Sequence, residues 1–373
     1  MPPQSRWRRP AQHFPLFPHL AIVPALLAAA TAVALFIHSD VNAALLWSQC
    51  HSHALLPALS RVPLLGTPAC FLVSFLHAAL DSTRSRAVMS VVLSYVGALL
   101  TVATVESARR VNAKNAVVSR PTLPWLVFNL LGGALLWQLV YAPAFILGAK
   151  AWPLPAVDDH GDGDGDGERP DASEAGKGRQ VKLVETVAIP VAVALGYYVP
   201  STLMLSLNDP AAIGAWLLFP AYVSLIRQLV RRGLSGLRRF RDGPTVHMEA
   251  SAGACVAVYA LPVACSLLAH GFVVGNLARP DDRQEVTRST VGLIEIDSQF
   301  VGLTMLYWVF TEVGWRAPLA MVLSSLVLGP GAGTALGWLY REKLITSDLA
   351  TRLLEQVDDG ERGDGGEQTP LIR

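Results

Sequence analysis

Long apolar stretches alternate with short polar segments along the chain. Nine stretches are near or above the roughly 20 residues that a helix needs to cross a bilayer, and they fall at about residues 16–37, 62–80, 87–106, 122–148, 187–207, 211–230, 251–274, 293–311 and 316–340. The eighth begins with acidic residues and is short, so it could dip into the membrane or lie along its surface rather than span it. The pattern therefore predicts an all-α fold, a polytopic transmembrane bundle of eight or nine helices.

Three polar segments interrupt or flank this predicted bundle, which occupies residues 16–340. Residues 1–15 form a basic N-terminal tail, residues 157–180 are rich in glycine and aspartate, and residues 341–373 are of low complexity. Segments with so few apolar residues cannot bury enough surface to fold. We therefore expect a disordered loop at 157–180 and a disordered C-terminal tail from residue 341.

Composition supports a multi-pass integral membrane protein. Hydrophobic residues make up 52% of the chain and charged residues only 16%, which is too apolar for an ordinary soluble domain. The 30 basic and 29 acidic residues leave a net charge of +1, so no overall field attracts a nucleic acid. The bilayer is the expected surrounding, nucleic-acid binding is not expected, and the sequence indicates no particular protein partner.

The third apolar stretch ends in an acid followed by two arginines. On a helix Glu106 lies three and four residues before Arg109 and Arg110, so either guanidinium can pair with its carboxylate. Asn112 follows closely. These residues either form an interfacial ion pair that anchors a helix end or line the mouth of a cavity, where Arg109 and Asn112 orient an acid or hold an anionic group.

Residues 293–315 contain three further acids in an apolar stretch. Glu295 and Asp297 are two residues apart, so on a helix they point to nearly opposite sides and only one can face a given pocket. Asp297 and Glu312 share a face within about 60° but lie roughly 22 Å apart along an uninterrupted helix. Each therefore needs a partner from another helix, unless it sits at a helix end in headgroup water. The candidate partners are Glu106, Arg109, Asp81 and Arg316.

The sequence offers no convincing metal site. His51 and His53 lie beside Cys50, but no second pair of ligands follows at a spacing that suits a metal. The aspartates of the 157–180 loop lack the glutamate that would complete a calcium loop. We expect neither a metal nor another cofactor. Tyr198 and Trp308 are candidates for the wall of an apolar pocket, although aromatic residues also form belts at membrane interfaces.

Several segments resemble a known family. The chain contains, in this order, the segments PLLGTPACFLVSFLHAAL, VESARR, ALGYYVPSTLMLS, and EID followed by TEVGW. On the order of these segments, the chain resembles the integral-membrane terpene cyclases of fungal meroterpenoid and sesquiterpenoid pathways, of the ascofuranone, ascochlorin and macrophorin kind. The resemblance covers most of residues 16–340. It implies a metal-free cyclisation, without a cofactor, in the endoplasmic reticulum membrane. A buried acid protonates an epoxide or terminal alkene of a farnesyl-type substrate, a carbocation cascade closes rings, and a base removes the last proton.

For such a reaction the candidate acids and bases are Glu106, Asp297 and Glu312. Arg109, Asn112, Glu295, Tyr198 and Trp308 are the candidates for orienting these groups or binding substrate. Which acid donates the proton is left open. A proton-coupled transporter of a small molecule is the alternative, because intramembrane acids paired with arginine also form proton relays. A lipid-binding scaffold, with the basic segment 227–241 against anionic lipid, is a third hypothesis.

Overall fold

The protein is described by a computed structural model, which covers residues 17–38, 41, 46, 48, 66–150, 178–237, 240, 243–248 and 251–364. The expected basic tail 1–15, residues 157–177 of the expected loop, and the His51–His53 pair lie outside the described residues. The elements, in chain order, are η2 (Pro18–Ile22), α1 (Val23–His38), α3 (Gly66–Ala79), α4 (Thr83–Ala108), η4 (Arg110–Asn112), α5 (Ala116–Ser119), α6 (Thr122–Leu131), α7 (Gly133–Leu136), η5 (Trp137–Tyr141), α8 (Ala142–Lys150), β1 (Val181–Lys182), α10 (Glu185–Val193), η6 (Ala194–Tyr198), α11 (Val199–Leu207), α12 (Pro210–Trp216), α13 (Phe219–Ser235), β2 (Thr245–Val246), α15 (Ala252–Leu277), α16 (Glu285–Val313), α17 (Arg316–Leu328) and α18 (Pro330–Asp364).

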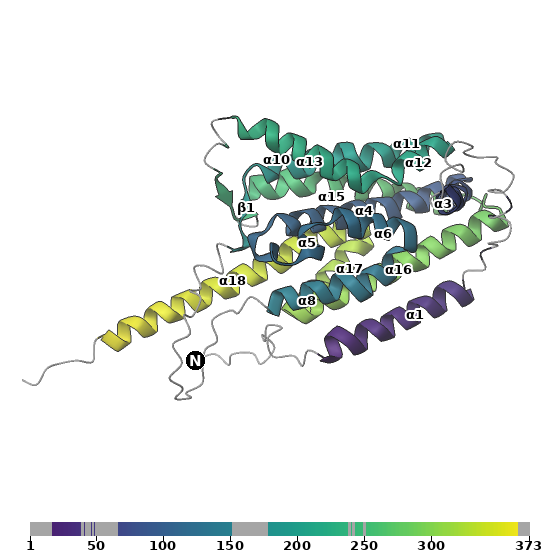
Figure 1. Ribbon diagram of the computed structural model, residues 1–373. Helices are drawn as coiled ribbons and strands as arrows, with labels where there is room; N and C mark the ends of the chain where they lie inside the picture. Colours follow the sequence, from purple (N-terminus) through teal and green to yellow (C-terminus); the bar gives the residue numbers. More distant parts are fainter. Residues whose placement is uncertain are drawn as a thin grey trace, which may run out of the picture.

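Helix α4 forms the centre of the bundle. It packs against α15, α18, α10 and α16 (Figure 1), and its side chains from Leu93 to Glu106 are all buried. A helix that is apolar on every side is expected in such a central position. The two strands add a short antiparallel pair, with Val181 opposite Val246.

The all-α prediction is confirmed, and each of the nine predicted stretches contains helix. Five of the described helices are long and apolar enough to cross a membrane, and the bent pair α12 and α13, which meet at 57°, adds a sixth if it counts as one span. The predicted number of eight or nine transmembrane helices is therefore not confirmed. The eighth stretch lies in α16, an uninterrupted helix of 29 residues that passes the same test.

Glycines explain why two other predicted stretches are shorter helices. Gly132 (φ 92°) separates α6 from α7, and Gly314 (φ 79°) and Gly329 (φ 89°) bracket α17. Positive φ values of this kind are readily adopted only by glycine and end a helix. The stretches 122–148 and 316–340 are therefore each divided, although their hydropathy is continuous.

The prediction that the chain is disordered from residue 341 onwards is wrong for residues 341–364, which are helical. Helix α18 continues to Asp364, and Arg341 and Glu342 are 3% and 1% exposed. Residue 179, assigned to the flexible loop, is also ordered, because Arg179 forms an ion pair with Glu342. Cys70 is in a disulfide, the thiol of Cys255 donates a hydrogen bond to the carbonyl oxygen of Met248, and Cys265 is not in a disulfide.

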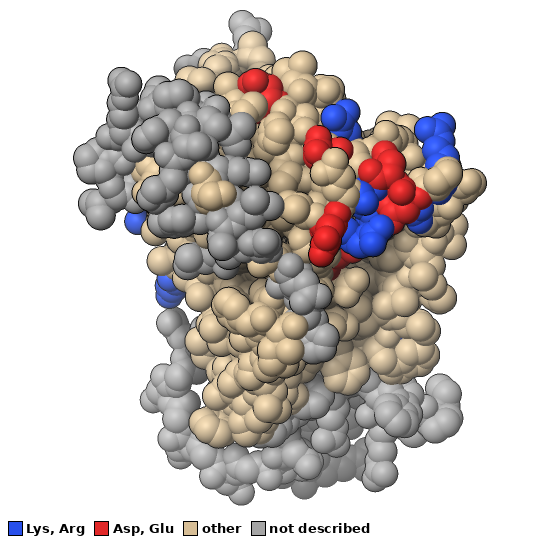
Figure 2. Space-filling view, turned by 90° about the vertical axis from the view of Figure 1, so that its right-hand side faces the viewer, with Lys and Arg blue, Asp and Glu red and all other residues tan. Residues whose placement is uncertain are grey.

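Charged side chains gather at the end of the bundle where α16 begins. Figure 2 shows acidic and basic residues grouped in one part of this face, and most of the other described residues visible in this view are uncharged. Asp282 accepts hydrogen bonds from the backbone N–H groups of Thr83 (2.8 Å) and Arg84 (3.1 Å) at the start of α4. Asp281 pairs with Arg283 (2.9 Å). The hydrogen bonds of Asp282 fasten the α15–α16 connection to α4, and the Asp281–Arg283 pair lies within this connection.

The contact between η6 and α13 depends on Gly196. A Cβ atom at this position would lie 2.7 Å from the backbone nitrogen of Val223 and 2.9 Å from its Cα. Because a backbone cannot rotate away as a side chain can, we expect Gly196→Ala to destabilise the protein by about 1–3 kcal/mol. Thermal unfolding in detergent measures this. Gly253→Ala, at a position with open space around it, is the matched control, and equal unfolding temperatures for the two variants would contradict the prediction.

Candidate active site

The carboxyl group of Asp297 is held at the start of α7. The backbone N–H groups of Gly133 and Ala134 donate to its Oδ2 (2.9 Å) and Oδ1 (3.0 Å). The first N–H groups of a helix have no partner within the helix, so a carboxylate satisfies them well. Gly132, which turns the chain between α6 and α7, makes these groups available to α16. The carboxyl group of Asp297 is thereby fixed in orientation.

Asp297 lies in the wall of a large apolar cavity of about 580 Å³. This volume is within the range of small-molecule sites. The wall is formed by α1, α3, α4, α6, α12 and α16, and its aromatic side chains are Phe36, Phe71, Phe75, Tyr95, Phe128 and Trp216. The other polar side chains are Asn129, Asp297 and Ser298, and none of the described lining residues is lysine, arginine or histidine. We call this space the large cavity.

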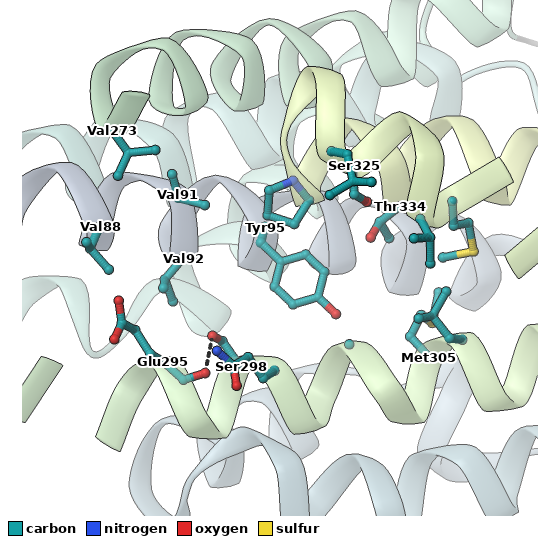
Figure 3. A pocket seen from close by; sticks show the side chains of 17 residues that line it. Val88, Val91, Val92, Tyr95, Val273, Glu295, Ser298, Met305, Ser325 and Thr334 are labelled. Carbon is teal, nitrogen blue, oxygen red and sulfur yellow. Dashed lines mark hydrogen bonds between the residues drawn. The ribbon is translucent and has the colours of Figure 1, made fainter. Parts of the chain in front are cut away.

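A second cavity of about 470 Å³ lies on the other side of α16, towards α15, α17 and α18. Its wall is mostly aliphatic but includes Tyr95, Glu295, Ser298, Gln299, Ser325 and Thr334. Figure 3 shows Tyr95 reaching from α4 into the space between α4 and α16, with Glu295 and Ser298 facing this space from α16. As helical geometry predicts, Glu295 and Asp297 line different cavities.

Glu106, in contrast, is enclosed by donors. Its Oε1 accepts from Nε of Arg109 (2.9 Å) and from Nε1 of Trp338 (3.3 Å), and its Oε2 accepts from Nδ2 of Asn112 (2.9 Å). The predicted grouping of Glu106, Arg109 and Asn112 is therefore present in the structure. The side chain of Glu106 lines neither cavity.

Glu312 belongs to the same cluster of charges. It is paired with Arg341 of α18, and Nη1 of Arg341 lies 3.9 Å from Oε1 of Glu106. Arg109 also reaches Oε2 of Glu342 at 3.3 Å. Neither Asp81 nor Arg316, the other proposed partners, forms an ion pair with a described residue.

The charge cluster comprises Glu106, Arg109, Arg179, Glu312, Arg341 and Glu342, so three carboxylates face three guanidiniums. Burial would raise the pKa of Glu342, but the guanidiniums of Arg109, Arg179 and Arg341 hold that pKa well below its usual range. A buried carboxylate with such partners is an ion-pair member rather than a proton donor. The cluster fastens α18 to α4 and α16.

The two aromatic candidates lie outside both cavities. Tyr198 packs against Gly97 of α4, where a Cβ atom would come within 2.5 Å of its hydroxyl oxygen. Trp308 is buried against Phe145 (ring centroids 4.2 Å apart) and Trp338 (4.9 Å). The guanidinium of Arg341 lies 4.0 Å from the ring centroid of Trp338, so these indoles shield the charge cluster.

Sequence reasoning missed Tyr95, Arg179, Arg341 and Glu342. The adjacent Arg341–Glu342 pair directly after the apolar GWLY segment is a signal that could have been used, because opposite charges at the end of an apolar helix suggest pairing. Tyr95 carries no such signal, since it is one aromatic residue in a long apolar stretch. Within the described residues there is no group of three or more His, Cys, Asp or Glu side chains that could hold a metal ion.

Part of the chain matches a known protein family. A family model described as the CtvD domain, the name of a terpene-cyclase-like family, matches residues 69–278, which is more than half of the chain. No curated protein and no solved structure matches the chain. The matched residues include α4 with Tyr95 and Glu106 and end before α16, which carries Glu295 and Asp297.

Proposed function

Because this chain belongs to the CtvD-domain family, we propose that it is a membrane-bound terpene cyclase that acts on a farnesyl-type substrate. The substrate belongs to meroterpenoid or sesquiterpenoid biosynthesis, and the endoplasmic reticulum is the proposed membrane. The helices that are long and apolar enough to cross a bilayer support a membrane location.

One observation carries this proposal: the carboxyl group of Asp297 lies, without an ion pair to any described residue, in the wall of an apolar cavity that includes six aromatic side chains. An apolar wall folds a polyene and excludes water. Aromatic faces and a carboxylate both stabilise developing positive charge. The described wall offers no basic residue for a diphosphate, which fits a substrate that is activated by protonation.

The proposed reaction is an isomerisation in which the protein lends and regains one proton. A carboxylic acid protonates the epoxide oxygen or the terminal alkene carbon. The neighbouring double bonds attack the cation in turn and form the carbon–carbon bonds of the rings. A carboxylate then removes a proton from carbon next to the last cation, which leaves a double bond. In this scheme Glu295 and Asp297 on α16 carry the chemistry, and Glu106 and Glu312 hold the fold.

Incubating microsomes that contain the protein with farnesylated phenol epoxides and unmodified farnesyl compounds tests the proposal. We expect a product of unchanged mass and new retention time. It should form equally well with and without a chelator, and it should not form in microsomes that lack the protein. Conversion of none of these substrates, together with solute flux in liposomes, would instead favour the proton-coupled transporter. No described feature supports that alternative better than the cyclase.

A further inference from the structure

The two cavities adjoin each other. Val92, Tyr95 and Ser298 line both, so these side chains of α4 and α16 lie at the boundary between the two spaces. Tyr95 is 5% exposed, and its hydroxyl group has no hydrogen-bond partner in the described structure. Leaving a buried hydroxyl group unpaired costs free energy, so a ligand oxygen at the boundary between the cavities would satisfy it.

The carboxyl groups in the two cavities have different surroundings. Asp297 accepts one backbone N–H bond on each oxygen, an arrangement that suits an anion. The carboxyl group of Glu295 forms no hydrogen bond or ion pair with a described residue. Arg283, in the α15–α16 connection, donates two hydrogen bonds to the carboxylate oxygens of Asp281 (2.9 and 3.0 Å), so its guanidinium is already paired. When two carboxyl groups lie in such unlike surroundings, they are suited to opposite roles in proton transfer.

The side chains that line the two cavities suit different steps of the reaction, namely protonation of the substrate and stabilisation of the cation that follows. The second cavity offers hydroxyl and amide donors from Tyr95, Gln299, Ser325 and Thr334, which can stabilise an oxygen as it gains a proton and its C–O bond breaks. The large cavity has the aromatic rings and a carboxylate, which stabilise the cation that follows.

We propose that the two cavities form one divided active site, in which Glu295 donates the initiating proton and Asp297 accepts the final one. This inference rests on the proposed cyclase function. The proton of the Glu295 carboxyl group goes to the epoxide oxygen, the C–O bond breaks, and the electron pair becomes that of the new hydroxyl group. After ring closure Asp297 takes a proton from carbon, and the C–H electron pair forms the double bond. Exchange with water restores both carboxyl groups.

The test uses Glu295→Gln and Asp297→Asn in microsomes supplied with a farnesylated phenol epoxide. We expect Glu295→Gln to slow substrate consumption by at least about 100-fold, within the range for loss of a general acid. Asp297→Asn should still consume substrate, at a rate reduced by no more than about 10-fold. Its product should change to isomers with a displaced double bond and to alcohols that carry one added water.

Two further variants keep the result interpretable. Asp297→Ser retains an oxygen that can accept an N–H bond from α7 but no base, so it should show the same change of product as Asp297→Asn. Glu285→Gln, at an exposed position in the first turn of α16, is the matched control and should behave as wild type. The amount of folded protein in each membrane is measured by gel filtration after detergent extraction.

The outcomes separate this inference from the function on which it rests. Wild-type membranes that convert no substrate overturn the cyclase itself. Three other outcomes overturn only the division of roles, provided that the wild type converts substrate. Both Asp297 variants give an unchanged product, or Glu295→Gln consumes substrate at more than a tenth of the wild-type rate. In the third, the pattern is reversed, so that consumption is blocked in the Asp297 variants and the product is altered in Glu295→Gln.

Discussion

Replacing Gly133 by alanine is expected to lower the rate at which the normal product forms by about 100-fold without changing any ionisable group. A Cβ atom at Gly133 would lie 2.4 Å from the Phe128 ring and 3.0 Å from Oδ2 of Asp297. The ring would have to move within the wall of the large cavity, and the carboxyl group would have to shift by a few tenths of an ångström from its place on α7. Misplacement of a catalytic group by about 1 Å can cost this factor, and here the cavity wall and the base move together.

The measurement is the initial rate at which the normal product forms per folded protein in matched microsomes. Gly292→Ala is the control, because it lies on α16 and an added Cβ atom there meets nothing within 4 Å. A Gly133→Ala protein that is as active as Gly292→Ala would show that the position of Asp297 does not matter for the reaction.

The largest effect on stability is expected from Arg341→Met. Arg341 is paired with Glu312 and Glu342 and lies within 3.9 Å of Glu106. Removing its charge leaves buried carboxylates with fewer partners, and breaking a buried ion pair in this way costs about 3–5 kcal/mol. The lost packing of its guanidinium on Trp338 adds to the effect.

Unfolding of the purified protein in detergent measures this loss. Arg316→Met, at an exposed arginine on α17, is the matched control and should change stability little. Adding Glu312→Gln to Arg341→Met should recover part of the loss, because the unpaired carboxylate is then removed as well. If the two single arginine variants unfold alike, the charge cluster does not fasten α18.

The helices were predictable from hydropathy because a bilayer imposes a minimum length and excludes charge. The places where helices break were less predictable. Gly132, Gly314 and Gly329 are three of the chain's 30 glycines and adopt positive φ values, whereas others, such as Gly97, lie inside a helix. This explains why nine apolar stretches produced fewer helices long enough to span.

The candidate site was predictable in part. The period of an α-helix was enough to place Glu295 and Asp297 on opposite sides and to separate Asp297 from Glu312. It could not identify their partners, since Asp297 binds backbone groups of α7, which have no side-chain signature in the sequence. Arg341 was assigned to a disordered tail because average hydropathy falls there, although its charge is balanced by acids from distant helices.

The central claim is that the carboxyl groups lining the cavities carry the reaction and those in the charge cluster do not. The most direct test measures the normal product per folded protein in four amide variants. These are Glu106→Gln, Glu295→Gln, Asp297→Asn and Glu312→Gln. We predict that the normal product is lost in the Glu295 and Asp297 variants and is retained in the Glu106 and Glu312 variants, even where the latter are less stable. Normal product from both the Glu295 and Asp297 variants, with its loss in folded Glu106→Gln or Glu312→Gln protein, would contradict the account.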